Sequence, residues 1–160
     1  MCENVSYGNP RRIGLIPEAS DIKVDLHLDQ RKKGLLWFST YTVAFDGVYT
    51  IHNPTPVRRD VTVALSLPTS EAIYDDLRFY VRDKEVEAVT TSQGWLSTVV
   101  TLEPGEATRV GMAYRSRGVD SWMFVLGKGA TQVKNLRVEV TTDFKAIDFP
   151  SRTISPSFSS

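Results

Sequence analysis

The sequence predicts an all-β fold, an antiparallel β-sandwich of about nine strands with at most short helical turns. Short runs in which hydrophobic and polar residues alternate recur along the 160 residues. Turn-forming Gly, Pro, Asn and Asp residues separate these runs at intervals of about 8–12 residues. No segment of roughly 12 residues has the periodicity of an amphipathic helix. Together these patterns favour a sandwich over α/β and α+β architectures.

The length and composition indicate one soluble domain. Hydrophobic residues make up 41% of the chain and charged residues 24%, which argues against a disordered chain and against a membrane span. The 19 Lys and Arg residues balance 19 Asp and Glu residues, so we expect no nucleic-acid partner. We expect the domain at residues 20–149, between a lead-in at 1–19 that is irregular apart from a short extended piece at 13–16 and a Ser/Pro-rich tail or linker at 150–160.

The clearest amphipathic strand spans residues 22–28. Apolar residues at the even positions alternate with polar or charged residues at the odd positions, so one face is expected in the core and the other in water. The basic turn at 30–34 then leads into the following strand. We expect that following strand to pair with 22–28.

The longest run of strand-favouring residues is 34–53, GLLWFSTYTVAFDGVYTIHN, which we expect to be a central strand. Alternation predicts that one face of it is buried, with the side chains of Trp37, Tyr41, Val43 and Phe45. Gly47 interrupts this pattern. Two alternatives follow: residues 48–51 continue the strand after a bend or bulge, or a tight turn at Asp46-Gly47 begins a second strand.

The remaining elements are short and separated by turns. A helical turn or a loop is expected at 69–77, a loop at 115–121, and a Pro-Gly turn at 103–106. Residues 79–81 and 86–89 are expected to form a hairpin that turns around Asp83-Lys84. The pattern of alternation predicts further strands at 61–67, 79–81, 86–89, 95–102, 108–114, 122–126 and 136–140.

The sequence contains no motif that predicts a catalytic, metal or cofactor site. His27 and His52 are the only histidines, and neither lies at metal-ligand spacing from a second His, Cys or carboxylate. We expect both to face solvent or to pack against neighbours. A hydrolase with a dispersed Ser/His/Asp site around His52 is one alternative, although no serine lies in a nucleophile-elbow motif.

Two kinds of surface residue are candidates for binding. The basic residues Arg31, Lys32, Lys33, Arg58 and Arg59 fall in predicted turns, where charge is ordinarily only solvated, but together at one end of the sandwich they would attract an anionic surface. The aromatic residues Trp95, Tyr114 and Trp122 are the alternative. They would form a platform for carbohydrate or peptide, or else pack in the core.

Four segments, in this order, resemble a known kind of protein. They are similar to the extracytoplasmic domain of CreD-like bacterial inner-membrane proteins, in which a β-rich domain is followed by several transmembrane helices. The resemblance covers roughly residues 30–157. Its segments are KKGLLWFSTYTVAFDGVYTIHNPT at 32–55, IYDDLRFYV at 73–81, LEPGEATRVGMAYRSRGVDSWMF at 102–124 and VKNLRVEVTTDFKAIDFPSRTISPS at 133–157.

The resemblance implies a domain on the extracytoplasmic side of the bacterial inner membrane, joined to the membrane by segments outside this sequence. It fits a start, MCENVSYGNPRR, that lacks the apolar core of a signal peptide. It implies no catalytic residue. We therefore expect a non-enzymatic sensing, scaffolding or protein-interaction domain without a cofactor, whose partner is another envelope protein or the rest of its own chain. A carbohydrate- or peptide-binding module is the second alternative beside the hydrolase.

Overall fold

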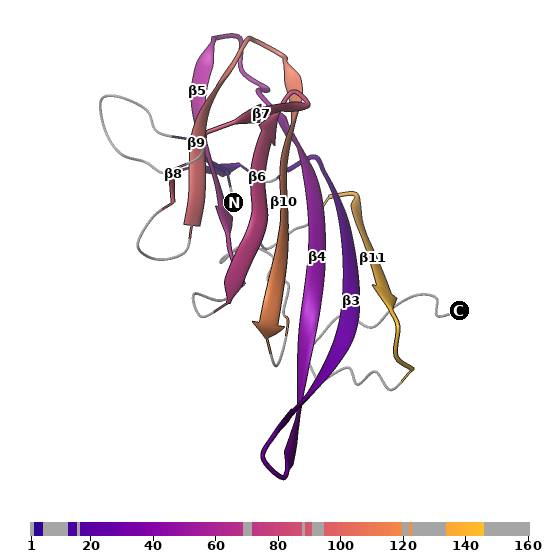
Figure 1. Cartoon of the computed structure of the whole chain (residues 1–160). Helices are drawn as coiled ribbons and strands as arrows, with labels where there is room; N and C mark the ends of the chain where they lie inside the picture. The colour runs from indigo at the N-terminus through magenta and orange to yellow at the C-terminus, as the bar shows by residue number, and fades with distance from the viewer. Residues whose placement is uncertain are drawn as a thin grey trace.

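The protein is an all-β sandwich of two sheets (Figure 1), as predicted. The computed structural model describes residues 2–4, 13–15, 17–68, 72–87, 89–90, 95–119, 122 and 134–145. One sheet has five strands in the order β2-β1-β5-β9-β8, and the other has six in the order β11-β3-β4-β10-β6-β7. The described residues thus contain eleven strands, where about nine were expected.

The strands differ greatly in length. The five-stranded sheet contains β1 (Cys2–Asn4), β2 (Ile13–Leu15), β5 (Arg59–Ser66), β8 (Val89–Thr90) and β9 (Trp95–Leu102). The six-stranded sheet contains β3 (Ala19–Lys33), β4 (Leu36–His52), β6 (Ile73–Val81), β7 (Lys84–Val86), β10 (Ala107–Val119) and β11 (Leu136–Thr142). Strand β1 lies in the lead-in that we expected to be irregular, and β2 falls on the short extended piece expected there at 13–16.

The core lies between the sheets and follows the alternation read from the sequence. In β3 the even positions point inward, and Ile22 and Val24 are at most 1% exposed. The same rule places one face of each long strand in a single hydrophobic cluster. Besides the β3 pair, its buried members are Val43, Phe45, Ile51, Val61, Val63, Leu65, Phe79, Leu96, Val100, Leu102, Val110, Met112 and Tyr114.

Strand β4 pairs with β3 as predicted and runs through Gly47 without a break. Its register with both β3 and β10 is continuous at this residue, which lies opposite Ile22 and Met112. The alternative of a tight turn at Asp46-Gly47 is therefore wrong, and so is a bulge. The glycine serves packing instead: an added Cβ would lie 2.8 Å from Cζ of the Phe45 ring.

Strand β11 departs from the predicted antiparallel arrangement because it pairs with β3 in parallel. Its start is fixed by Asn135, whose Nδ2 donates to the Glu18 carbonyl oxygen at 2.9 Å. After its end, the Asp143 carboxylate accepts the Leu28 N–H at 3.0 Å and lies 3.4 Å from Nδ1 of His27. The Leu28 hydrogen bond, with a smaller contribution from His27, lowers the pKa of Asp143.

Three local predictions need correction. Residues 73–77 form part of β6 and not a helical turn, while 69–71 lie outside the described residues. Residues 115–119 continue β10 and are not a loop. The hairpin of β6 and β7 turns at Arg82-Asp83, one residue earlier than expected. Both residues have positive φ, 52° and 61°, as in a type I′ turn. The predicted strand at 122–126 lies largely outside the described residues.

Candidate interaction site

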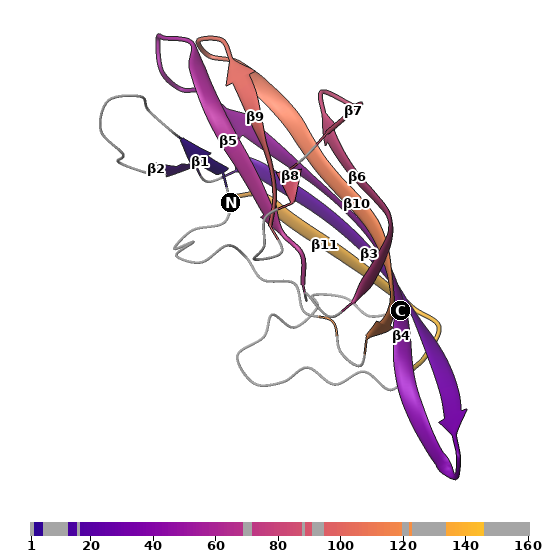
Figure 2. The ribbon, with the colours of Figure 1, turned by 60° about the vertical axis from the view of Figure 1, so that its left-hand side comes forward.

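The hairpin of β3 and β4 extends beyond every other described strand. The last β4 residue paired with β10 is Tyr41, and the last β3 residue paired with β11 is Leu26. Residues 29–40, here called the distal ribbon, therefore pair only with each other among the described residues. At about 3.3 Å per residue the distal ribbon is roughly 15 Å long. Figures 1 and 2 show it projecting from the sandwich.

The distal ribbon closes with a two-residue turn. Lys33 pairs with Leu36, so Gly34 and Leu35 are the central residues of the turn. Gly34 has φ of +64°, and Leu35 is not among the residues with positive φ. This is the pattern of a type II′ turn, in which glycine takes the first central position. The local sequence thus places Leu35 at the end of the β3–β4 hairpin.

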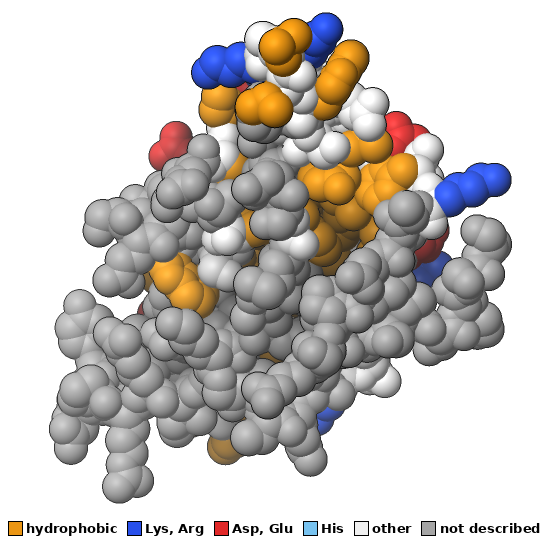
Figure 3. All heavy atoms as spheres, turned by 90° about the horizontal axis from the view of Figure 1, so that it is seen from below, with side chains coloured by type: hydrophobic (Ala, Val, Ile, Leu, Met, Phe, Trp, Pro, Cys, Tyr) orange, Lys and Arg blue, Asp and Glu red, His pale blue; other side chains and the backbone are white. Residues whose placement is uncertain are grey.

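Three consecutive apolar side chains are exposed at this tip. Leu35 is 93% exposed, Leu36 66% and Trp37 67%. The prediction that Trp37 is buried with Val43 and Phe45 is wrong, because the opposite sheet does not reach this far along β4. Figure 3 views the molecule from below, the side toward which the hairpin points. On this side, hydrophobic side chains lie exposed beside Lys and Arg side chains.

Three cations lie on the β3 side of the same tip. Arg31 donates through Nε to Asp29 Oδ2 at 2.8 Å. Lys32 Nζ lies 5.7 Å from the centre of the Trp37 ring, within the range of a cation–π contact. Lys33 is exposed and is paired through its backbone with Leu36. The tip is therefore both apolar and positively charged.

The other predicted basic pair lies at the opposite end of β4. Arg58 faces Glu103 at 3.6 Å, and Nε of Arg59 donates to Thr55 Oγ1 at 3.1 Å. Strand β4 has 17 residues, which separates Arg58 and Arg59 from the tip by roughly 50 Å at about 3.3 Å per residue. The five basic residues therefore do not form one surface.

The predicted aromatic residues do not form one platform either. Tyr114 is a core residue, 3% exposed, stacked on Phe45 at 4.9 Å, and burial raises the pKa of its hydroxyl. Nε1 of Trp122 donates to the Tyr114 hydroxyl at 3.2 Å. Trp95 precedes the core residue Leu96 in β9 and so points to the opposite face of that sheet.

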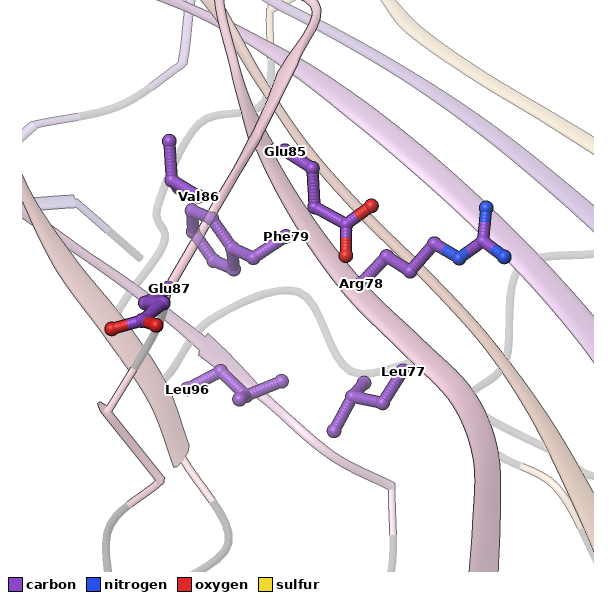
Figure 4. Close-up of a pocket in the computed structure, with 7 residues that line it drawn as sticks. All are labelled: Leu77, Arg78, Phe79, Glu85, Val86, Glu87 and Leu96. Carbon is purple, nitrogen blue, oxygen red and sulfur yellow. The ribbon is translucent and has the colours of Figure 1, made fainter.

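A hollow lies at one edge of the sandwich, between β6, β7 and β9 (Figure 4). Its volume is about 480 Å³, within the usual range of ligand sites. The side chains of Glu85, Glu87 and Arg78 add charge to its apolar lining, and a hydrogen bond with Tyr80 raises the pKa of Arg78. The apolar lining residues are Leu77, Phe79, Val86 and Leu96.

The two histidines lie in different strands and differ in their exposure and in their neighbours. His27 is exposed beside Asp143, whereas His52 is half-buried at the end of β4, opposite Ala107. Within the described part of the chain, no hydrogen bond or ion pair links His52 to a serine or a carboxylate. The same part of the chain contains no group of three or more His, Cys, Asp or Glu residues that could hold a metal ion.

Leu35 and Leu36 are the site residues that sequence reasoning missed. The predicted basic turn ended at Gly34, so both leucines were assigned to the following strand. A signal was nevertheless present, because Gly is strongly preferred at the first central position of a type II′ turn. A turn centred on Gly34-Leu35 would have predicted from the sequence alone that Leu35 is exposed.

Comparisons with known proteins give no family for the chain. No family model matches it, and no curated protein matches it. Among solved structures, it is similar to a "putative nutrient binding protein" from Legionella pneumophila subsp. pneumophila strain Philadelphia 1, with 11% sequence identity and a TM-score of 0.42. The likeness covers 72% of this chain and 42% of that one, so this chain spans less than half of that protein's length.

Proposed function

We propose that this chain is the extracytoplasmic β-sandwich of a CreD-like bacterial inner-membrane protein and acts as a non-enzymatic interaction domain. The order of the four resembling segments supports its origin. Its contact element is the tip of the distal ribbon. The observation that carries the proposal is the run of three exposed apolar side chains, Leu35, Leu36 and Trp37, at the end of the projecting hairpin.

An exposed tip of this kind is unfavourable in water. A two-stranded ribbon without a third strand or a covering layer is marginally stable by itself. Clustered exposed apolar side chains also mark sites of contact with proteins or membranes. A projecting, apolar ribbon therefore fits an element whose exposed surface becomes covered when the domain meets its partner.

Site-specific photo-crosslinking tests this function. A photoreactive amino acid replaces Leu36 in the full-length protein in the cells that make it, and a matched control replaces Val99, which is 64% exposed on β9. We expect covalent adducts from position 36 and few from position 99. Equal labelling from both positions, or no adduct from position 36, would contradict the proposal.

Peptide binding in the hollow between β6, β7 and β9 is a second candidate function. The specific observation is its mixed lining, in which Phe79 and Leu96 form an apolar floor and Arg78 and Glu85 offer charges of both signs. Titration with envelope-derived peptides, followed by nuclear magnetic resonance shifts of the Val86 methyl groups, tests this candidate. Val86 methyl shifts that stay unchanged at saturating peptide would refute it.

Among the residues that the structure describes, there is no helix that could span a membrane.

A further inference from the structure

We propose that the tip of the distal ribbon inserts into the headgroup region of a bilayer that contains anionic phospholipids. The inference rests on the proposed function, because it names the partner of the same contact element. Three observations carry it: the distribution of apolar side chains around the tip, the local excess of positive charge, and the length of the distal ribbon.

Apolar side chains occupy both faces of the tip. Lys32 pairs with Trp37 and Lys33 with Leu36, and neighbouring residues of a strand point to opposite faces. Trp37 therefore lies on one face and Leu36 on the other, with Leu35 at the turn between them. A groove on a protein would cover one face of a ribbon, whereas a lipid interface surrounds it. The arrangement favours the lipid interface.

The charges at the tip complement an anionic surface. The distal ribbon carries three cations, Arg31, Lys32 and Lys33, against the single carboxylate of Asp29, although the whole chain has no net charge. Basic residues next to a membrane are attracted by anionic headgroups. The excess of positive charge is thus placed where the apolar tip would enter.

The side chains also suit the boundary between headgroups and acyl chains. Tryptophan is enriched there because its ring is largely apolar and its N–H is polar. Lysine can bury its aliphatic stem while its ammonium group stays among the headgroups. Lys32 and Trp37 are already in contact at 5.7 Å, so both can occupy that boundary together.

The length of the distal ribbon lets the tip enter a bilayer ahead of every other described strand. Interfacial amphipathic helices bury their apolar faces about 5–10 Å into the boundary between headgroups and acyl chains, and we take this as the depth that the tip has to reach. The distal ribbon extends roughly 15 Å past the last rung shared with a neighbouring strand. The tip can therefore reach this depth while the sandwich itself remains outside the bilayer.

Vesicle binding tests the apolar contribution. The chain is sedimented with vesicles of phosphatidylcholine mixed with phosphatidylglycerol, and the bound fraction gives an affinity. We expect Leu36→Ala to weaken binding about tenfold, since it removes inserted methyl and methylene groups. The matched control Val99→Ala removes an equally exposed apolar side chain of the five-stranded sheet and should leave the affinity unchanged within about twofold.

The charge contribution is tested with two variants of equal net charge. Replacing Lys32 and Lys33 by Gln should weaken binding about fivefold for each cation removed. Replacing Lys23 and Lys84 by Gln should have little effect on the affinity for vesicles, because both residues are exposed elsewhere on the six-stranded sheet. Vesicles of phosphatidylcholine alone should bind the unmodified chain much more weakly than the mixed vesicles.

Three results would overturn the inference. They are no binding to the mixed vesicles, equal binding to both vesicle types, and equal loss of binding in the tip variants and their controls. If position 36 crosslinks to a protein in cells while the vesicles fail to bind, the membrane inference is wrong and the proposed interaction domain stands. If neither experiment shows contact at the tip, both are wrong.

Discussion

Gly47 shows how one residue can decide the packing of a central strand. An added Cβ would lie 2.8 and 2.9 Å from two atoms of the Phe45 ring and 3.2 Å from Cδ1 of Ile22. Both neighbours are buried, so they have little room to move. We expect Gly47→Ala to lower the free energy of unfolding by about 1–3 kcal/mol, the usual cost of overpacking, measured by urea denaturation.

Gly111 provides the matched control for that variant. It lies on the adjacent strand β10, opposite Val48, and its added Cβ would make only ordinary contacts, the nearest being the Gly47 carbonyl oxygen at 3.4 Å. Gly111→Ala should change the free energy of unfolding by less than about 1 kcal/mol. Equal destabilisation by the two variants would contradict a steric role specific to Gly47.

Asn53 is the second residue with a role larger than its sequence context suggests. It is 2% exposed. Its Oδ1 accepts from the Thr55 N–H at 3.2 Å and from the Thr55 hydroxyl at 2.7 Å. Its Nδ2 donates to three carbonyl oxygens, those of Val57 at 2.8 Å, Leu102 at 3.2 Å and Glu103 at 3.1 Å. One side chain thus joins the end of β4 to two separate loops.

The Asn53 amide group leads to a prediction with an ordered outcome. Asn53→Ala should lower the free energy of unfolding by about 2–3 kcal/mol, because buried carbonyl groups lose their donor. Asn53→Asp should cost more at neutral pH, since a carboxylate would face the same carbonyl oxygens. Urea denaturation gives both values. An Asp variant as stable as the native chain would refute this role.

At the scale of the element, the distal ribbon should matter little for stability. Leu36 is 66% exposed and Leu96 is 4% exposed, so the same substitution separates surface from core. We expect Leu36→Ala to change the free energy of unfolding by less than about 0.5 kcal/mol and Leu96→Ala to lower it by about 2–5 kcal/mol. Thermal unfolding measures both. A large loss from Leu36→Ala would mean that the tip is covered in the free chain.

The junction of β3 and β11 should make stability depend on pH. The pKa of Asp143 is lowered in the folded chain, chiefly by the Leu28 N–H and also by His27. The stabilisation is therefore fully present above the unfolded pKa of about 3.9 and is lost as the pH falls through the folded value.

The variant Asp143→Asn isolates the charge, because its amide oxygen can still accept the Leu28 N–H. Thermal unfolding across a pH series should show the native chain to be more stable than the variant near neutral pH. This difference should shrink as the pH falls below about 4. A difference that stays constant down to the lowest pH would show that the carboxylate charge makes no contribution.

Alternation predicted the long elements well and their ends poorly. The faces of β3, β5 and β10 follow from the period of two, because sheet packing imposes that period directly. The interruption at Gly47 misled because glycine can serve side-chain packing as well as backbone bending. The predicted loop at 115–121 failed over 115–119 because Arg115 and Arg117 alternate with the buried Ser116, a strand with a small polar residue on its core face.

At the scale of the whole molecule, the sandwich is assembled from distant segments. Lys134 and Glu18, which form an ion pair at 3.1 Å where β11 meets β3, are 116 positions apart. Sandwiches with such non-local pairing fold slowly, typically in milliseconds to seconds. Stopped-flow tryptophan fluorescence should show refolding in this range, and complete refolding within microseconds would contradict it.

The site was predictable only in its charged half. Arg31, Lys32 and Lys33 stand out in the sequence as a basic turn. The exposure of Trp37, in contrast, depends on where β10, β11 and the opposite sheet end, and no local pattern records those ends. The separation of Arg58 from the tip likewise follows from a strand that is continuous through Gly47, which the sequence left undecided.

The unbroken pairing of β3 and β4 connects the tip directly to the opposite end of the sandwich. The two strands pair at fifteen successive positions from Ala19 to Lys33, and β4 continues to the loop held by Asn53. When the tip is held in place, a rotation of the domain about it moves the opposite ends of the two strands the most. With β4 roughly 50 Å long, a tilt of about 10° at the tip displaces the opposite loops by roughly 9 Å. Small changes of angle at the tip are thereby converted into large changes of position at the far end.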